Sequence, residues 1–402
     1  MKKKEFRDRY SLQIKIHYNL FIAVLICMLF GALMQYSASN ASIAILKKSL
    51  SFILISLIAF ALIQNLNIRN FTLLFGKYLY FASFLLMFLL LTPAAIESHG
   101  AKRWIQVFGI QFQVAEILKI SVILYEAYLI NYFSNFKLNN KGKYIEILLL
   151  WAAGVIPTML LFILSKDLSS SAVILVITFA VSFVASEKIW PFLAAAGSVI
   201  GFVYYYVMKI AIDLPTQAEL DLLPFRIGRI AAWIEPERYK SNQGYQVLQS
   251  LYAIGSGGFF GKGLGRSVIK TRMPEAHTDM IFSIICEELG IVAGAMIIAI
   301  LAYIVYLIIR VSINAESILE SVVALGIAVH IGFQSIVNVG VCLNLIPNTG
   351  IGLIFISYGG TALSTQMAEI GMITAISKRN CIASAKRQLK KVNKIYFIVD
   401  EK

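Results

Sequence analysis

The chain has 402 residues, of which 58% are hydrophobic and only 14% are charged, and its mean hydropathy is +0.75. A soluble domain keeps about 25% of its residues charged, so this composition excludes a soluble protein and indicates an integral membrane protein. The formal net charge of +14 does not indicate a nucleic-acid partner, because most of the basic residues gather at the two ends of the chain. That placement is typical of cytoplasmic retention and of contact with anionic membrane lipids.

Ten stretches are apolar enough to cross a bilayer, for which about 20 residues of helix are needed. The sequence therefore predicts an all-α integral membrane protein with about ten transmembrane helices. The expected spans lie near residues 18–38, 46–66, 76–95, 114–134, 144–164, 169–187, 189–212, 279–310, 318–341 and 350–377.

Basic residues precede the first expected span and follow the last one, which places both termini in the cytoplasm and requires an even number of spans. No small-residue cleavage site separates the basic start from the first apolar run, so this span is expected to be retained. The predicted organisation is a cytoplasmic tail over 1–17, a transmembrane domain over 18–380 and a basic cytoplasmic tail over 381–402.

The connection over 213–278 then lies outside the cell, and a loop of this length is usually functional. "PFRIGRIAAWIEP" alternates apolar and basic residues as in a helix that lies on the membrane surface, and "GYQVLQSLYAIGSGG" predicts a second helix. The glycine run "GSGGFFGKGLG" lacks the P-loop pattern, since Ser256 and Gly263 stand where Gly and Ser or Thr are required. We expect tight turns there and no nucleotide.

The four cysteines have no paired spacing, which argues against a disulfide framework or a zinc site. They are Cys27, Cys286, Cys342 and Cys381.

Asp279 opens the expected span over 279–310, and Glu287 and Glu288 follow about 12 Å deeper at 1.5 Å per residue. Two interpretations of Thr278 and Asp279 remain open on spacing alone. They cap the helix with their side-chain oxygens, or Asp279 has a chemical role, because carboxylates at membrane depth face partners or a wet cavity.

Other charged residues also allow two interpretations each. Glu116 and Lys119 stand at i, i+3, either as a buried ion pair or as a site for an anionic head group. Basic residues crowd the outer loop, either to bind lipid phosphate or to keep a long loop soluble; they include Arg226, Arg229 and Lys262.

Glycines and Pro347 in "NLIPNTGIGLIFISYGGTALSTQ" predict a broken start to the last expected span. Irregular backbone at membrane depth must lie against protein or water, so this segment is expected to line a cavity or to pack closely against a helix through its small residues.

Three segments resemble the SEDS family of shape, elongation, division and sporulation proteins, which contains RodA, FtsW and SpoVE. They are "GAKRWIQVFGIQFQVAEILKISVILY", "GYQVLQSLYAIGSGGFFGKGLGRS…MPEAHTDMIFSIICEELG" and "LIPNTG…FISYGG". The resemblance covers roughly residues 18 to 380, and Gly244, Tyr245 and Gln246 resemble the FtsW and SpoVE branch more than RodA. The chain departs from the family pattern around Asp167, where "SKDLSSS" replaces the usual Gln-Pro-Asp-Leu-Gly, and at Gly352 and Ile354, which replace prolines.

The resemblance implies a ten-helix glycosyltransferase of the cell membrane that polymerises lipid II onto a glycan carried by undecaprenyl pyrophosphate. It also implies a class B penicillin-binding protein as partner. Asp279 matches the family's essential aspartate and is expected to be the general base, a ligand of a divalent metal such as Mg or Mn, or both. The residues expected to bind substrate are Lys119, Glu116, Arg226, Arg229, Gln246, Gln249, Ser250, Lys262, His277, Thr278, Asn338, Ser357 and Tyr358. A transporter that moves lipid-linked sugar across the bilayer is the alternative.

Overall fold

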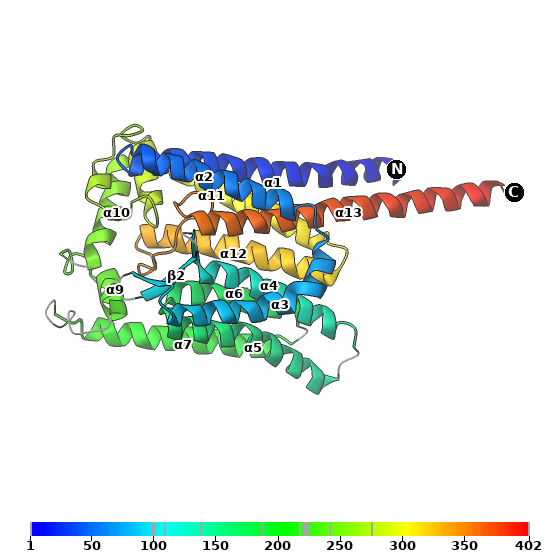
Figure 1. Cartoon of the computed structure of the whole chain (residues 1–402), viewed down its shortest axis with the longest axis horizontal. Helices are drawn as coiled ribbons and strands as arrows, with labels where there is room; N and C mark the ends of the chain where they lie inside the picture. Colours follow the sequence, from blue (N-terminus) through cyan, green and yellow to red (C-terminus); the bar gives the residue numbers. More distant parts are fainter. Residues whose placement is uncertain are drawn as a thin grey trace.

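Long helices run side by side along the length of the molecule in this computed structural model, and two shorter helices cross one end of the bundle (Figure 1). The structure describes residues 2–98, 101–107, 110–136, 139–186, 188–216, 219, 225–241, 243–274 and 276–400; side chains are described over these ranges except for 2–15, 98, 101, 107, 110, 225, 226, 243 and 383–400.

The bundle contains α1 (Lys2–Ala38), α2 (Ile43–Ile63), α3 (Ile68–Phe88), α4 (Val114–Phe133), α5 (Asn140–Ser165), α6 (Leu168–Ala185), α7 (Trp190–Ile212), α11 (Ile281–Ile313), α12 (Ile318–Cys342) and α13 (Gly360–Asp400). The crossing helices are α9 (Phe225–Ile234) and α10 (Gln243–Gly257). Short 3-10 helices form at η1 (Leu89–Leu91) and η2 (Ile269–Thr271), and three strands form at β1 (Ala95–Ser98), β2 (Ala101–Val107) and β3 (Ile110–Gln113).

Eight of the described helices are long and apolar enough to cross a membrane. The other two bundle helices, α4 and α13, carry more charge, but both pack among the apolar helices: α4 lies against α3, α6 and α12, and α13 lies against α1 and α2. With these two the bundle has ten long helices, as predicted. The two termini leave it at the same end (Figure 1), which an even number of crossings requires.

Side-chain caps start several helices where polar residues interrupt the apolar runs. Asn67 accepts a hydrogen bond from the backbone N–H of Asn70 at 3.2 Å, so α3 begins at Ile68, eight residues before the predicted start at 76. Asp167 accepts from the N–H of Ser170 at 3.1 Å and from its hydroxyl at 2.8 Å. The buried carboxylate of Asp167 therefore caps α6, in the usual manner of an N-cap aspartate.

Two segments differ from an all-α chain. Residues 95–98, 101–107 and 110–113 form a small antiparallel sheet of order β1-β2-β3, in which Trp104 pairs with Gln113 and Ile105 with Phe112. In β2 the side chain of Ile105 is fully buried and that of its neighbour Gln106 is exposed, as expected of a strand that is buried on one face. The last predicted span begins at residue 350, but α13 starts only at Gly360, and residues 343–359 form turns and irregular backbone.

The glycine run between α10 and α11 forms the tight turns expected from its sequence, with positive φ at Gly258, Gly261, Gly263 and Gly265. These turns pack against a break in α11 at Gly290, where φ is 83° and ψ is 173°. The break frees backbone groups of α11: Glu287 and Glu288 accept hydrogen bonds from the N–H groups of Lys262 and Gly263 at 3.0 and 2.8 Å. The loop is therefore joined to the membrane helix through its backbone.

We predict that Gly261→Ala and Gly290→Ala destabilise the fold, while Gly255→Ala does not. A Cβ on Gly261 would overlap the backbone of Glu288, and one on Gly290 would overlap the backbone of Phe259, whereas a Cβ on Gly255 meets only open space. Strain at positive φ and overpacking together cost about 2 kcal/mol or more. The measurement is the thermal unfolding midpoint of detergent-purified protein. Equal midpoints for all three variants would contradict this account of the loop.

Candidate functional site

Asp279 lies in a turn directly before α11, and its half-buried carboxylate contacts Gln246 of α10, one of the two helices that cross the end of the bundle. One carboxylate oxygen accepts hydrogen bonds from the side-chain amide of Gln246 at 3.4 Å and from the hydroxyl of Thr278 at 3.3 Å. The helix begins at Ile281 with Met280 as its N-cap residue, and Met280 makes no side-chain capping bond. Asp279 thus precedes the N-cap position, which favours a role beyond capping.

The backbone on both sides of this carboxylate is fixed by residues that come from elsewhere in the chain. The carbonyl of His277 accepts from the N–H of Tyr358 at 3.1 Å, and the carbonyl of Thr278 accepts from the hydroxyl of Ser357 at 2.5 Å. The carbonyl of Asp279 itself accepts from the amide of Asn338 at 2.7 Å. Three successive carbonyls are therefore held, so that the position of the carboxylate is set before any substrate arrives.

Segment 343–359, which provides two of these three contacts, is held in turn by the outer helices. The guanidinium of Arg229 on α9 donates to the carbonyl of Asn348 at 3.0 Å, and the amide of Asn348 donates to Gln246 on α10 at 2.8 Å. The indole of Trp233 donates to the carbonyl of Asn344 at 3.0 Å. Gln246 consequently contacts both the carboxylate and the segment that supports it.

Aromatic rings flank the same turn. The rings of His277 and Tyr358 meet edge to face with centroids 5.4 Å apart. An imidazole and a phenol therefore lie beside the turn that carries Asp279.

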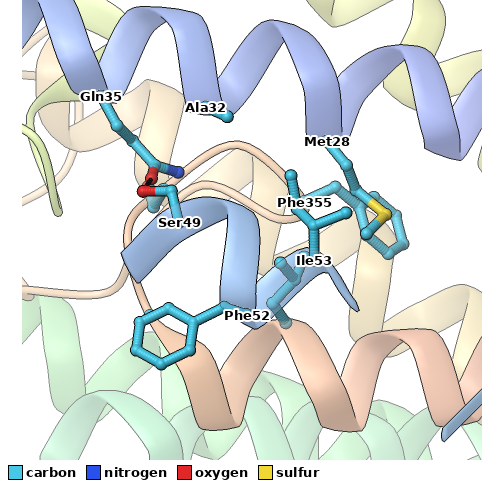
Figure 2. Close-up of a pocket in the computed structure, with 10 residues that line it drawn as sticks. Met28, Ala32, Gln35, Ser49, Phe52, Ile53 and Phe355 are labelled. Carbon is cyan, nitrogen blue, oxygen red and sulfur yellow. Dashed lines mark hydrogen bonds between the residues drawn. The ribbon is translucent and has the colours of Figure 1, made fainter. Parts of the chain in front are cut away.

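A small pocket of about 10 Å³ lies behind segment 343–359, between α1, α2 and the start of α13. Figure 2 shows that Gln35 and Ser49 point toward each other at one side, while Met28, Ile53 and Phe355 crowd the other. Ser357, which holds Thr278, also lines this pocket. The irregular segment is therefore packed partly against protein and partly against this space, as expected of non-helical backbone inside a bundle.

Lys119 and Glu116 form the ion pair that one of the two interpretations anticipated. The ammonium of Lys119 lies 2.8 Å from Glu116 and donates to the amide oxygen of Gln334 at 2.9 Å. Lys119 is only 1% exposed and Glu116 only 5%. The pair is thus part of a buried network, connected with Asp279 through α12 rather than through direct contact.

Two further residues that were expected to bind substrate, Lys262 and Ser250, have mainly structural partners. Lys262 pairs with Glu287 at 2.7 Å, and its side chain is 31% exposed. The buried hydroxyl of Ser250 contacts Ser283 and donates to the carbonyl of Cys342. The amide oxygen of Gln249 is buried, and the side chain of Arg226 lies outside the described residues.

Glu287 and Glu288 hold the glycine-rich loop. Glu287 accepts from the N–H groups of Val268 and Ile269, and Glu288 pairs with Lys270 at 3.2 Å and accepts from Ser37 on α1. Both carboxylates are fully buried. They therefore anchor the loop and the end of α1, and their cost of burial is offset by these partners.

A divalent metal would find a sparse set of protein ligands here. Among the residues that the structure describes, no group of three or more His, Cys, Asp or Glu side chains is placed to hold an ion. Asp279 offers one carboxylate and Gln246 one amide, and Mg²⁺ is commonly held by one or two carboxylates together with substrate phosphates. The residues thus fit a metal shared with a phosphorylated substrate, with Asp279 as its protein ligand.

Sequence reasoning missed the residues that connect the parts of this site: Gln334, His330, Glu369, Asn348 and Trp233. The first three are polar residues inside apolar helices, with His330 and Gln334 at i, i+4, and this could have marked them as a buried cluster. Asn348 and Trp233 act through backbone carbonyls, and no spacing rule in the sequence indicates such contacts.

The family model of the FtsW, RodA and SpoVE proteins, described as "Cell cycle protein", matches residues 16–381. The chain is 35% identical over 309 residues to a probable peptidoglycan glycosyltransferase FtsW of Coxiella burnetii, covering 75% of this chain and 78% of that protein. It is 32% identical over 371 residues to the stage V sporulation protein E of Bacillus subtilis, covering 89% and 96%.

Among solved structures, the fold matches a chain from a peptidoglycan synthase complex that coordinates polymerization and crosslinking. The TM-score is 0.71 at 23% identity, and the match covers 90% of this chain and 98% of that chain. The helical membrane architecture predicted from the sequence is thereby confirmed.

We predict that Lys119→Met strongly destabilises the protein and that adding Glu116→Gln restores much of the loss. Removing one partner of a buried ion pair costs about 3–5 kcal/mol, because the remaining charge is left unpaired, whereas replacing both is much less harmful. The thermal midpoints of the single and double variants measure this. An unchanged midpoint with a raised KM for Lys119→Met would instead favour direct binding of an anionic head group.

Proposed function

The chain belongs to the family of FtsW, RodA and SpoVE, and we propose from this premise that Asp279 is the general base of a peptidoglycan glycosyltransferase. The enzyme polymerises lipid II into glycan strands at the outer face of the cytoplasmic membrane. The observation that supports this best is the clamping of Asp279: hydrogen bonds from Tyr358, Ser357 and Asn338 hold the backbone from 277 to 279.

The chemistry needs a base at this position. An acceptor hydroxyl of a sugar is a poor nucleophile until its proton is removed, and a carboxylate within hydrogen-bond reach removes it in the transition state. Substitution with inversion at an anomeric carbon normally uses one base and one acid. Because pyrophosphate leaves without protonation when cations neutralise it, one carboxylate is sufficient.

Cations for the pyrophosphate are available in the segment that precedes Asp279. Arg229 reaches the segment that supports Asp279 through the carbonyl of Asn348, and Lys262 keeps 31% of its side chain exposed while it pairs with Glu287. A divalent metal held by Asp279 would supply the same neutralisation of charge. Arg229 and Lys262 are therefore the residues that we assign to phosphate binding, and we make the same assignment for Arg226 from the sequence alone.

The orientation that this reaction requires is supported by the charge distribution. Basic residues at both ends of the chain favour the cytoplasmic side, and segment 213–278 lies at the end of the bundle opposite to the termini (Figure 1). Asp279 then faces the outside of the cell. We further propose that a class B penicillin-binding protein crosslinks the strands, since the structural relative comes from a complex that combines polymerization with crosslinking.

A transporter of lipid-linked sugar is the second candidate, because irregular backbone over 343–359 within a helical bundle is also typical of transport proteins. A transporter would move labelled lipid II between the leaflets of a vesicle without making polymer, with or without the penicillin-binding protein.

We predict that purified protein makes glycan strands from lipid II and that Asp279→Asn lowers the rate by about 10²–10⁴-fold, the usual contribution of a general base. The control is Asp213→Asn, an exposed aspartate at the end of α7 in the same connecting segment, which is expected to keep the full rate. Strand length and yield on gels measure both variants.

Undiminished synthesis by Asp279→Asn would refute the assignment of the base. Chelator tests the metal role: activity that survives EDTA leaves Asp279 the role of base alone, whereas activity that EDTA abolishes and Mg²⁺ restores shows that the reaction needs a metal, for which Asp279 would be the protein ligand.

A further inference from the structure

Two buried pairs of ionisable side chains, Glu116–Lys119 and His330–Glu369, meet at the amide of Gln334. Glu116 and Lys119 lie on α4, His330 lies on α12 and Glu369 on α13, and each is at most 5% exposed. Lys119 pairs with Glu116, and Nδ1 of His330 lies 2.8 and 3.0 Å from the two oxygens of Glu369. Gln334 on α12 lies between the pairs: its amide oxygen is 2.9 Å from Lys119 and 3.1 Å from Nε2 of His330.

The orientation of this amide follows from its neighbours. An ammonium group only donates hydrogen bonds, so that Lys119 requires the oxygen of Gln334 to face it. The same oxygen can only accept a hydrogen bond from Nε2 of His330, so the network places a proton on Nε2, while Nδ1 faces the carboxyl group of Glu369. The NH₂ group of Gln334 must then point away from Lys119 and His330.

That NH₂ group points at the segment that supports Asp279. It donates to the carbonyl of Gly352 at 3.3 Å, and one helical turn further along α12 the amide of Asn338 donates to the carbonyl of Ile351 at 2.8 Å and to the carbonyl of Asp279 at 2.7 Å. One face of α12 thus holds two adjacent carbonyls of segment 343–359 as well as the backbone of Asp279. Of these two amides, only Gln334 is oriented by buried charges.

We propose that Gln334 is a positioning residue for the reaction: the buried Glu116–Lys119 and His330–Glu369 pairs fix its amide, and the amide fixes the segment that holds Asp279. This proposal rests on the proposed function, because it takes Asp279 to be the base. It also gives the Glu116–Lys119 pair a role in the reaction without any contact with substrate.

The proposal is tested by kinetics of lipid II polymerisation with full-length wild-type protein and Gln334→Leu, Gln334→Glu and Ser335→Ala variants. Gln334→Glu keeps acceptors for Lys119 and His330 but places an oxygen against the carbonyl of Gly352. Ser335→Ala is the matched control on the same helix, since the hydroxyl of Ser335 donates a hydrogen bond to the carbonyl of Ile331 within α12. Misplacing a reacting group by about 1 Å lowers the rate by about 10²-fold, so that both Gln334 variants should lose 10- to 100-fold in kcat with little change in KM.

A double-variant comparison separates positioning from general damage. If Gln334 acts through Asp279, Gln334→Leu should cause no further loss in the Asp279→Asn background, because residues that act as a unit are not additive. The pH profile of kcat should shift on its acidic side for Gln334→Glu and stay unchanged for Ser335→Ala.

Wild-type kcat and pH profile for either Gln334 variant, or additive losses in the double variant, would overturn the proposal while the role of Asp279 stands. A wild-type protein without polymerase activity would instead overturn the proposed function. If Gln334→Leu does not fold, as its thermal midpoint would show, Gln334→Glu and its pH profile decide the question.

Discussion

Hydrogen bonds to three successive carbonyls, those of His277, Thr278 and Asp279, join the start of α11 to segment 343–359 and to α12. A carboxylate at a helix start would otherwise move with its turn, and catalysis by a general base depends on its exact distance from the proton. The rest of the site can be understood as support for these bonds. Helices α9 and α10 hold segment 343–359 from outside through Arg229 and Gln246, and α12 holds it from inside.

The pairing of buried charges explains how the contacts that support Asp279 stay in place within a membrane. An unpaired charge in a region without water costs several kcal/mol, and the buried ion pairs around the site have partners whose geometry is tightly restricted. Glu287 and Glu288 fix the glycine-rich loop through Lys262 and Lys270. The pairs on α4, α12 and α13 fix the amide of Gln334. In both cases the electrostatic requirement determines where a backbone segment lies.

Glycines make this arrangement sterically possible. The break of α11 at Gly290 exposes carbonyls that the loop then uses, and a side chain at Gly257, Gly261 or Gly290 would overlap the opposing backbone. The glycine-rich loop and α11 therefore form one unit, and Asp279 lies directly before α11. The glycines permit the positive φ angles of the turns, and backbone hydrogen bonds then hold the turns in place.

The sequence alone determined the membrane class, the ten long helices and the position of Asp279 at the start of one of them. Hydropathy and charge are properties of single residues, so that they can be summed along a segment without knowledge of its neighbours in space. It also marked the glycine turns and the irregular start of the last span. The sheet of β1, β2 and β3 and the true start of α13 were missed, since short strands and loops depend on neighbours more than on composition.

Only the tertiary structure decided which polar residues meet. Lys119 and Gln334 are 215 positions apart, and Ser357 is 79 positions from Thr278. Their contacts depend on the packing of α4, α12 and segment 343–359, and a pattern within one helix cannot encode the face of another. The sequence therefore predicted Asp279 as a functional residue but not the hydrogen bonds that hold it. Those bonds are made to backbone carbonyls, which every residue has, so that no side-chain pattern indicates them.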